Sequence, residues 1–189
     1  MHSMKRRRQV SAAAALAIVA AAVVGIQAAA TFTATAAVSS PKGKAAAPVT
    51  ISVERFVSDA DRDQVMTAVK TNDQDAIQKA LAKLPDVGFI ELAGRRTPIK
   101  YAYARPTGAG RLVTVVTAEP ILFLGGAAPK AKPREGFNVA FALLVLDASS
   151  AGDGELAPAA KLKVDTAGAI VTEGYTTETI RLTKIARAK

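Results

Sequence analysis

Hydrophobic residues are most concentrated at residues 137–148 (FNVAFALLVLDA), the longest apolar run after the N-terminal region. Apolar side chains occupy odd positions such as Phe141 and Leu143, and also even positions such as Leu144 and Leu146. Such a pattern is typical of a strand that is covered on both faces. The run is too short to cross a bilayer as a helix, which takes about twenty residues. We therefore predict a central strand in which Leu143 and Leu144 are both buried.

Shorter strand patterns lie on both sides of this run. Residues 49–54 alternate between apolar and polar side chains, which predicts a half-buried strand. Turn residues separate the other apolar segments, so antiparallel pairing is expected. The remaining predicted strands are residues 87–92, 99–105, 112–118, 161–165, 169–174 and 179–185, with a short strand or sheet edge at residues 121–124.

Two helices are predicted between Ser58 and Pro85. Ser58 has the character of an N-cap, aspartates follow it where the helix dipole favours anions, and Asn72 ends the first helix and caps the second. Pro85 ends the second helix. The two helices form an αα-hairpin laid against one face of the sheet. Its predicted apolar positions are Val65, Met66, Val69, Ile77, Leu81 and Leu84.

Together these elements predict an α+β fold. An αα-hairpin packs on an antiparallel sheet of about seven or eight strands. The sheet either stays open or curls toward a barrel. Curling, a second layer, or a homodimer through the uncovered face would each explain why residues 137–148 are apolar on both faces.

The N-terminal region has the pattern of an export signal. Residues 5–8 are positively charged, residues 12–26 are apolar and uncharged, and small residues at 28–30 and 34–36 both satisfy an A-x-A cleavage rule. We expect the protein to be exported to the periplasm or secreted, with no transmembrane span after cleavage. A retained N-terminal anchor is the alternative.

The expected domain organisation follows from this signal. Residues 1–36 are predicted to be the signal peptide. Residues 37–48 are rich in Ala, Ser, Pro and Lys, and are predicted to be a flexible linker. Residues 49–189 are then a single domain, whose length is ordinary for one hydrophobic core.

The amino-acid composition limits the metal sites and catalytic mechanisms that the domain could have. The chain has no Cys, and its one His is His2 in the targeting segment. The domain therefore lacks the residues for thiolate or imidazole zinc sites and for Ser-His or Cys-His catalysis, so no cofactor is expected. Loss of the four basic residues at 5–8 lowers the net charge from +9 to +5, which favours solubility more than nucleic-acid binding.

Tyr101, Tyr103 and Arg105 form the candidate ligand site. Strand side chains alternate, so these three residues are expected on one face together with Ile99. Two aromatic rings offer stacking surface, and a guanidinium binds a carboxylate or phosphate. The alternative is structural: half-buried tyrosines beside an arginine that pairs with a neighbouring carboxylate.

Other segments suggest a site less strongly. Residues 147–155 resemble a calcium loop, but Ala151 and Pro158 stand where ligands are required, so a hairpin turn explains them. Gly125 and Gly126 lack the spacing of a phosphate loop. Five basic residues could form a polyanion patch, although aromatic residues do not alternate with them: Lys130, Lys132, Arg134, Lys161 and Lys163. The dense carboxylates have a helix-capping explanation: Asp59, Asp61, Asp63, Asp73 and Asp75.

A resemblance is carried by residues 51–56 (ISVERF), by Asp59-x-x-Arg62-Asp63, and by residues 81–88 (LAKLPDVG). Residues 103–105 (YAR), Tyr175 and residues 181–183 (RLT) fit it too. These motifs resemble an uncharacterised group of exported bacterial proteins. The resemblance implies a signal peptide followed by one small domain. The group has no known activity, so the resemblance implies no function.

The function expected from the sequence is therefore a non-catalytic exported domain that binds a protein partner or a small ligand in the cell envelope. A carboxylate-based hydrolase is one alternative, because two carboxylates opposed across a cleft would suffice for it. A module that binds anionic polymers or a membrane surface is the other.

Overall fold

The computed structural model describes residues 28–40, 43–121, 134–173 and 180–188. In this part of the chain, nine strands and two helices form an α+β domain. The elements are β1 (Ala30–Ser40), β2 (Gly43–Val53), α1 (Asp59–Lys70), α2 (Gln74–Lys83), β3 (Gly88–Leu92), β4 (Arg95–Thr107), β5 (Gly110–Thr117), β6 (Val139–Asp147), β7 (Gly152–Val164), β8 (Ile170–Glu173) and β9 (Ile180–Arg187).

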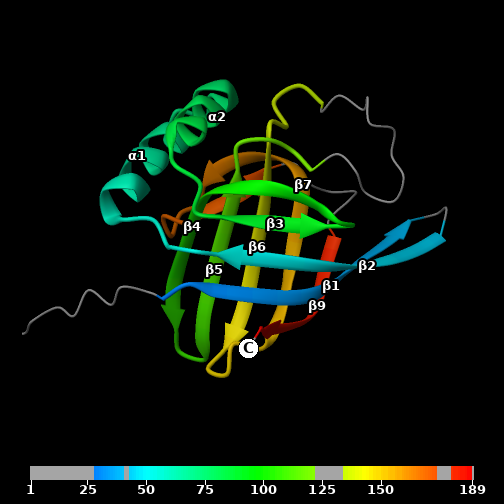
Figure 1. Cartoon of the computed structure of the whole chain (residues 1–189). Helices are drawn as coiled ribbons and strands as arrows, with labels where there is room; N and C mark the ends of the chain where they lie inside the picture. Colours follow the sequence, from blue (N-terminus) through cyan, green and yellow to red (C-terminus); the bar gives the residue numbers. More distant parts are fainter. Residues whose placement is uncertain (1–27, 41–42, 122–133, 174–179, 189) are drawn as a thin grey trace, which may run out of the picture.

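Eight of the described strands close into an antiparallel barrel. The order around the wall is β1, β2, β3, β4, β5, β6, β7 and β9, and β9 pairs back with β1. β8 continues from the far end of β7 as a short hairpin outside this ring. Figure 1 shows β1, β2 and β3 crossing one side of the barrel at a steep angle to β5, β6 and β7. The predicted α+β antiparallel fold is confirmed, and of the open and curled sheets the curled one is observed.

The barrel interior is filled by side chains from alternate positions of each strand. On β6 the inward residues include Ala142 and Leu144, and Ala142 pairs with Val115 on one side and Leu156 on the other. All four of these residues are fully buried. Alanines take part in this interior beside Phe32 and the branched aliphatic residues, which fill most of the space.

The outward face of β6 differs from the prediction. Val139 and Phe141 are buried on this face, but Leu143 is half-buried and Val145 is 53% exposed. The helices and β8 cover only part of the outer wall, so the far half of β6 faces solvent on that side. Leu144 therefore lies in the core as expected, whereas Leu143 does not.

The largest difference from the sequence prediction lies at the N-terminal side of the barrel. Residues 37–40 and 43–48, which were expected to form a linker, belong to β1 and β2. β1 starts at Ala30, inside the segment expected to be the signal peptide, and Phe32 on it is only 1% exposed. β1 bridges β2 and β9, so the barrel closes through it. The folded domain therefore starts near residue 30 instead of 49.

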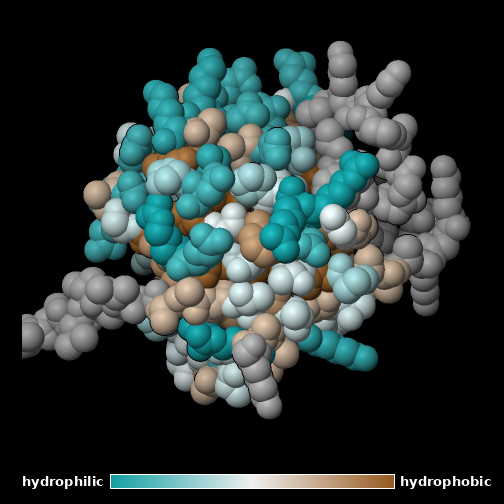
Figure 2. Space-filling model, in the orientation of Figure 1, coloured by the Kyte–Doolittle hydropathy of each residue, from teal (hydrophilic) through white to brown (hydrophobic). Residues whose placement is uncertain are grey.

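The two helices form the expected αα-hairpin. The Ser58 hydroxyl accepts a hydrogen bond from the Asp61 amide at 3.1 Å, which confirms the predicted N-cap of α1. The cap of α2 is Asp73 and not Asn72; Asn72 adopts a left-handed conformation with a φ of 60°, which makes the turn between the helices. Hydrophilic residues cover the outer surface of both helices (Figure 2).

Two glutamines of α2 fix the hairpin on the barrel. The Gln74 side chain donates to the Leu162 carbonyl at 3.0 Å and accepts from the Leu162 amide at 2.8 Å, as a neighbouring strand would. Gln78 donates to the Ala118 carbonyl at the end of β5 at 3.0 Å. The hairpin thus lies over one end of the barrel, against β4 and β7 and beside the ends of β5 and β6 (Figure 1). Neither of the described helices has the length and hydrophobicity that a membrane crossing requires.

Candidate functional site

A β-bulge in β4 decides which side chains face outward from the barrel. Ile99 pairs with Thr117, but Tyr101 pairs with the very next residue of β5, Val116. The extra residue, Lys100, donates to the Leu84 carbonyl at 3.1 Å at the end of α2. The bulge reverses the alternation, as an unpaired extra residue must. Ile99 therefore points into the barrel with Thr117, which corrects the expectation that it shares a face with Tyr101.

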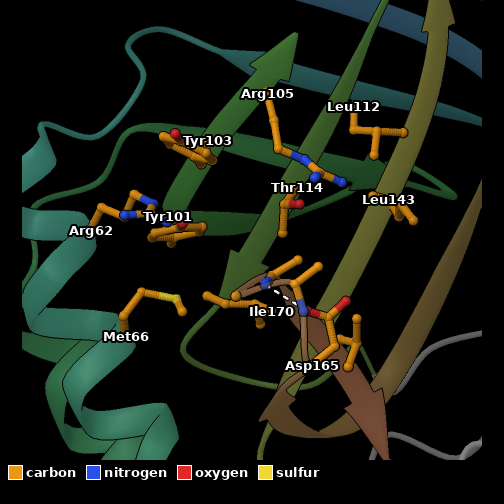
Figure 3. A pocket seen from close by; sticks show the side chains of 14 residues that line it. Arg62, Met66, Tyr101, Tyr103, Arg105, Leu112, Thr114, Leu143, Asp165 and Ile170 are labelled. Carbon is orange, nitrogen blue, oxygen red and sulfur yellow. Dashed lines mark hydrogen bonds between the residues drawn. The ribbon is translucent and has the colours of Figure 1, made fainter. Parts of the chain in front are cut away.

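Tyr101, Tyr103 and Arg105 remain together on the outward face. Across the strands, Thr114 lies between Tyr103 and Leu143, and Leu112 lies beside Arg105. Leu112 and Thr114 form the floor of a pocket of about 240 Å³ that Tyr101, Tyr103 and Arg105 also line (Figure 3). We call it the β4–α1 pocket. Its walls are Arg62 and Met66 of α1, Leu143 of β6, and the β7–β8 hairpin with Asp165 and residues 167–171.

The two tyrosine rings make one wall of the β4–α1 pocket. Their centroids are 6.4 Å apart and their planes are tilted by 32°. Tyr101 is only 2% exposed, and burial raises the pKa of its phenol far above the ordinary value, with the nearby Arg62 charge opposing the shift. No described residue forms a hydrogen bond with the Tyr101 hydroxyl. It is therefore a neutral phenol in the pocket wall whose polar tip has no described protein partner.

The two arginines of the pocket differ in what they already bind. The Arg62 guanidinium lies 5.0 Å from the centre of the Tyr103 ring, and its Nη1 is 3.4 Å from Asp63 Oδ1. Arg105 is exposed, and no described residue forms an ion pair, hydrogen bond or ring contact with its side chain. The structural alternative, in which Arg105 pairs with a neighbouring carboxylate, therefore finds no partner in the described part of the chain.

Asp165 is the carboxylate of the pocket lining, and its Oδ1 is already engaged. It accepts hydrogen bonds from the Ala167 amide at 2.9 Å and the Ala169 amide at 2.8 Å, which shape the turn between β7 and β8. Figure 3 places Asp165 and Arg105 on opposite sides of the pocket, with Arg105 extending across it toward Thr114 and Leu143. Asp165 therefore holds the wall, and Arg105 faces the open space.

Sequence reasoning found the β4 residues of the pocket and missed the others. Leu112 and Thr114 could have been found, because they alternate on the strand that follows the Gly108 to Gly110 turn and must oppose β4. Arg62 and Met66 could not, because nothing in the local pattern of a helix says which strand it will cover. The β7–β8 hairpin reaches the pocket through the barrel topology alone.

The remaining sequence candidates have structural roles where they are described. Asp147 Oδ1 accepts hydrogen bonds from the Ser149 amide, the Ser149 hydroxyl and the Ala151 amide at 2.7–3.0 Å. These bonds lower the pKa of Asp147, and the bond from the Ser149 side chain contributes most. They give Asp147 a structural role in the turn that resembles a calcium loop in sequence. No cluster of three potential metal-ligating side chains is found in the described residues.

The other sequence candidates are the glycine and basic residues of the predicted loop and patch, and the five aspartates. Gly125, Gly126, Lys130 and Lys132 lie outside the described residues. Arg134 and Lys161 both lie near the Phe137 ring, with charge-to-centroid distances of 5.8 Å and 5.2 Å, so an aromatic ring does accompany these two cations. The five aspartates stand in or near the first turns of α1 and α2, where Asp73 is the cap.

Comparison of the chain with family models, curated proteins and solved structures finds no match.

Proposed function

We propose that this protein is an exported, non-catalytic domain that binds a small anionic ligand in the β4–α1 pocket. The observation that carries the proposal is Arg105: its guanidinium faces a pocket and lacks any described partner. A planar guanidinium can hold a carboxylate or phosphate through two parallel hydrogen bonds. The neighbouring tyrosine rings supply contact surface for the remainder of the ligand.

Ligand binding is favoured over hydrolysis at this pocket by its carboxylate content. A carboxylate-based hydrolase needs two carboxyl groups that face each other across the substrate. Among the described lining residues Asp165 is the carboxylate, and its Oδ1 is occupied by two backbone amides. The pocket thus offers binding groups in place of an acid and base pair.

The test is a thermal-shift and calorimetric screen of small anions against wild type, Arg105→Ala and Arg105→Lys. Arg181→Ala is the matched control, because it removes an exposed arginine of β9 that does not line the pocket. Wild type and Arg181→Ala should respond to the same anions, and Arg105→Ala should bind them about tenfold more weakly. Arg105→Lys should be nearly as weak, since an ammonium lacks the planar fork. Equal responses from all four proteins would refute the proposed site.

A second candidate function rests on Phe137. Arg134 and Lys161 both lie close to this half-buried ring, and a basic and aromatic surface of this kind suits an anionic polymer. If this surface binds polyanions, Lys161→Ala should shorten retention on a heparin column, and wild-type retention should fall steeply with salt. Retention that is insensitive to salt, or that Arg105→Ala lowers as much as Lys161→Ala, would argue against it.

A further inference from the structure

The distribution of charge in the β4–α1 pocket limits how many negative groups a ligand can carry. Arg105 provides one guanidinium without a described partner, while Arg62 is engaged with Asp63 and the Tyr103 ring. The Asp165 carboxylate on the opposite side would repel a second anionic group. A ligand with one negative group at the Arg105 side is therefore the best electrostatic match.

The rest of the lining suits an apolar body. Leu143, Ile170 and Met66 face the wall made by Tyr101 and Tyr103. An apolar cavity of about 150 Å³ holds the six carbons of benzene, so by comparison a volume of about 240 Å³ holds an apolar body of about eight to ten non-hydrogen atoms. Aromatic and aliphatic surfaces on facing walls accept either a flat ring or a short alkyl chain.

We infer that the ligand is a monocarboxylate with a compact apolar body of about eight to ten non-hydrogen atoms. Its carboxylate lies on the Arg105 guanidinium, and its body lies between the tyrosine wall and Leu143 with Ile170. The shared chemistry is one carboxylate on an apolar body, whether that body is an alkyl chain or an aryl ring. This inference rests on the proposed function and adds the class of ligand.

Titration of the full-length protein with straight-chain carboxylates from butyrate to nonanoate tests the inference. Each added methylene should tighten binding about fourfold, because burial of one CH₂ contributes a fixed free energy, until the pocket is full. Nonanamide, which keeps the chain without the charge, should bind at least about tenfold more weakly than nonanoate. Tyrosine emission reports binding directly, since two of the three tyrosines line the pocket and the chain has no Trp.

Two further ligands identify the body and the charged group. 3-Phenylpropionate and nonanoate both carry eight carbons beyond the carboxyl carbon, so tighter binding of one identifies an aryl or an alkyl body, and either supports the inference. Octyl phosphate carries a second negative charge and should bind more weakly than nonanoate. Tighter binding of octyl phosphate would overturn the assignment to carboxylates.

Two variants connect these affinities to the pocket. Arg105→Ala should abolish the difference between nonanoate and nonanamide. Thr114→Phe places a ring over the centre of the floor and should abolish the dependence on chain length, with its melting temperature confirming that it folds. Wild-type affinities independent of chain length would overturn the inference while leaving anion binding intact. Failure of every anion to bind would overturn the inference and the proposed function together.

Discussion

Tyr101 combines a buried aromatic ring with a polar hydroxyl group that no described residue binds. Its ring is almost completely buried, yet its hydroxyl has no described hydrogen-bond partner. Burial of this phenol removes it from solvent, which favours its neutral form. The hydroxyl of Tyr101 is thus available to the ligand that we propose for the β4–α1 pocket.

Tyr101→Phe should therefore leave the free energy of unfolding at pH 7 unchanged or slightly raised, because it removes the hydroxyl and keeps the ring. Folding raises the pKa of this phenol above the unfolded value of 10.0, so its contribution to stability is present below pH 10 and is lost as the pH rises further. The wild type should lose up to about 1.4 kcal/mol per pH unit from this group, and Tyr101→Phe should not. Urea denaturation between pH 9 and 11 measures both slopes.

Tyr103→Phe is the control for that experiment, since it removes a hydroxyl from the more exposed ring and retains Tyr101. It should keep the wild-type slope at alkaline pH. Parallel curves for wild type and Tyr101→Phe above pH 10 would contradict the assignment of a desolvated phenol.

Among the elements, β6 shows how far alternation predicts burial. Its even positions face the barrel interior and its odd positions face outward, where cover changes along the strand. The sequence could predict that both faces are apolar, because that is a property of the residues. It could not predict how far the β7–β8 hairpin and the helices reach, because that is set by contacts distant in the chain.

The two adjacent leucines of β6 provide a direct test. Leu144→Ala should cost about 2–5 kcal/mol in the free energy of unfolding, because it leaves a cavity in the closed interior. Leu143→Ala should cost about 1 kcal/mol, because Leu143 is only half-buried and borders the β4–α1 pocket, so its removal leaves no closed cavity. Guanidinium denaturation of both variants gives the comparison. Equal large losses would mean that the outer face of β6 is covered as fully as the inner one.

The sequence of β1 does contain a strand pattern, although its residues were predicted to belong to the signal peptide and the linker. Residues 30–36 (ATFTATA) place apolar residues at even positions and threonines at odd positions, which is the alternation of a half-buried strand. The pattern follows directly on the apolar segment that is predicted to be an export signal, and it contains an A-x-A motif, so its small residues favoured the interpretation as a cleavage site. The bulge at Lys100 could not be predicted, because no residue near it has a preference for bulges.

At the scale of the whole molecule, the barrel limits where an export signal can be cut. Cleavage after Ala36 would remove seven of the eleven residues of β1, with the buried Phe32 and all but one of the positions that pair with β9. Cleavage after Ala30 leaves nearly all of β1. We therefore expect the mature chain to begin at Thr31, which N-terminal sequencing of protein from an exporting host would establish.

Ala28→Asp tests which of the two A-x-A motifs is cleaved. Ala28 is exposed and precedes β1, so its replacement leaves the barrel unchanged while it spoils the small-residue rule of the first A-x-A motif. The uncleaved precursor should accumulate. Normal processing of Ala28→Asp, with Ala37 as the first residue, would show that the second motif is the one used.

The pairing of β1 with β9 also determines when the barrel can form. Phe32 pairs with Arg187, and Ala36 pairs with Leu182, so the first and last described strands are neighbours in the wall. This seam cannot form in a nascent chain until the residues of β9 have been synthesised. Contacts of such high sequence separation slow folding to about milliseconds to seconds. The barrel can therefore close only after β9 has been synthesised, and the earlier strands are not yet joined into a ring while the chain is being made.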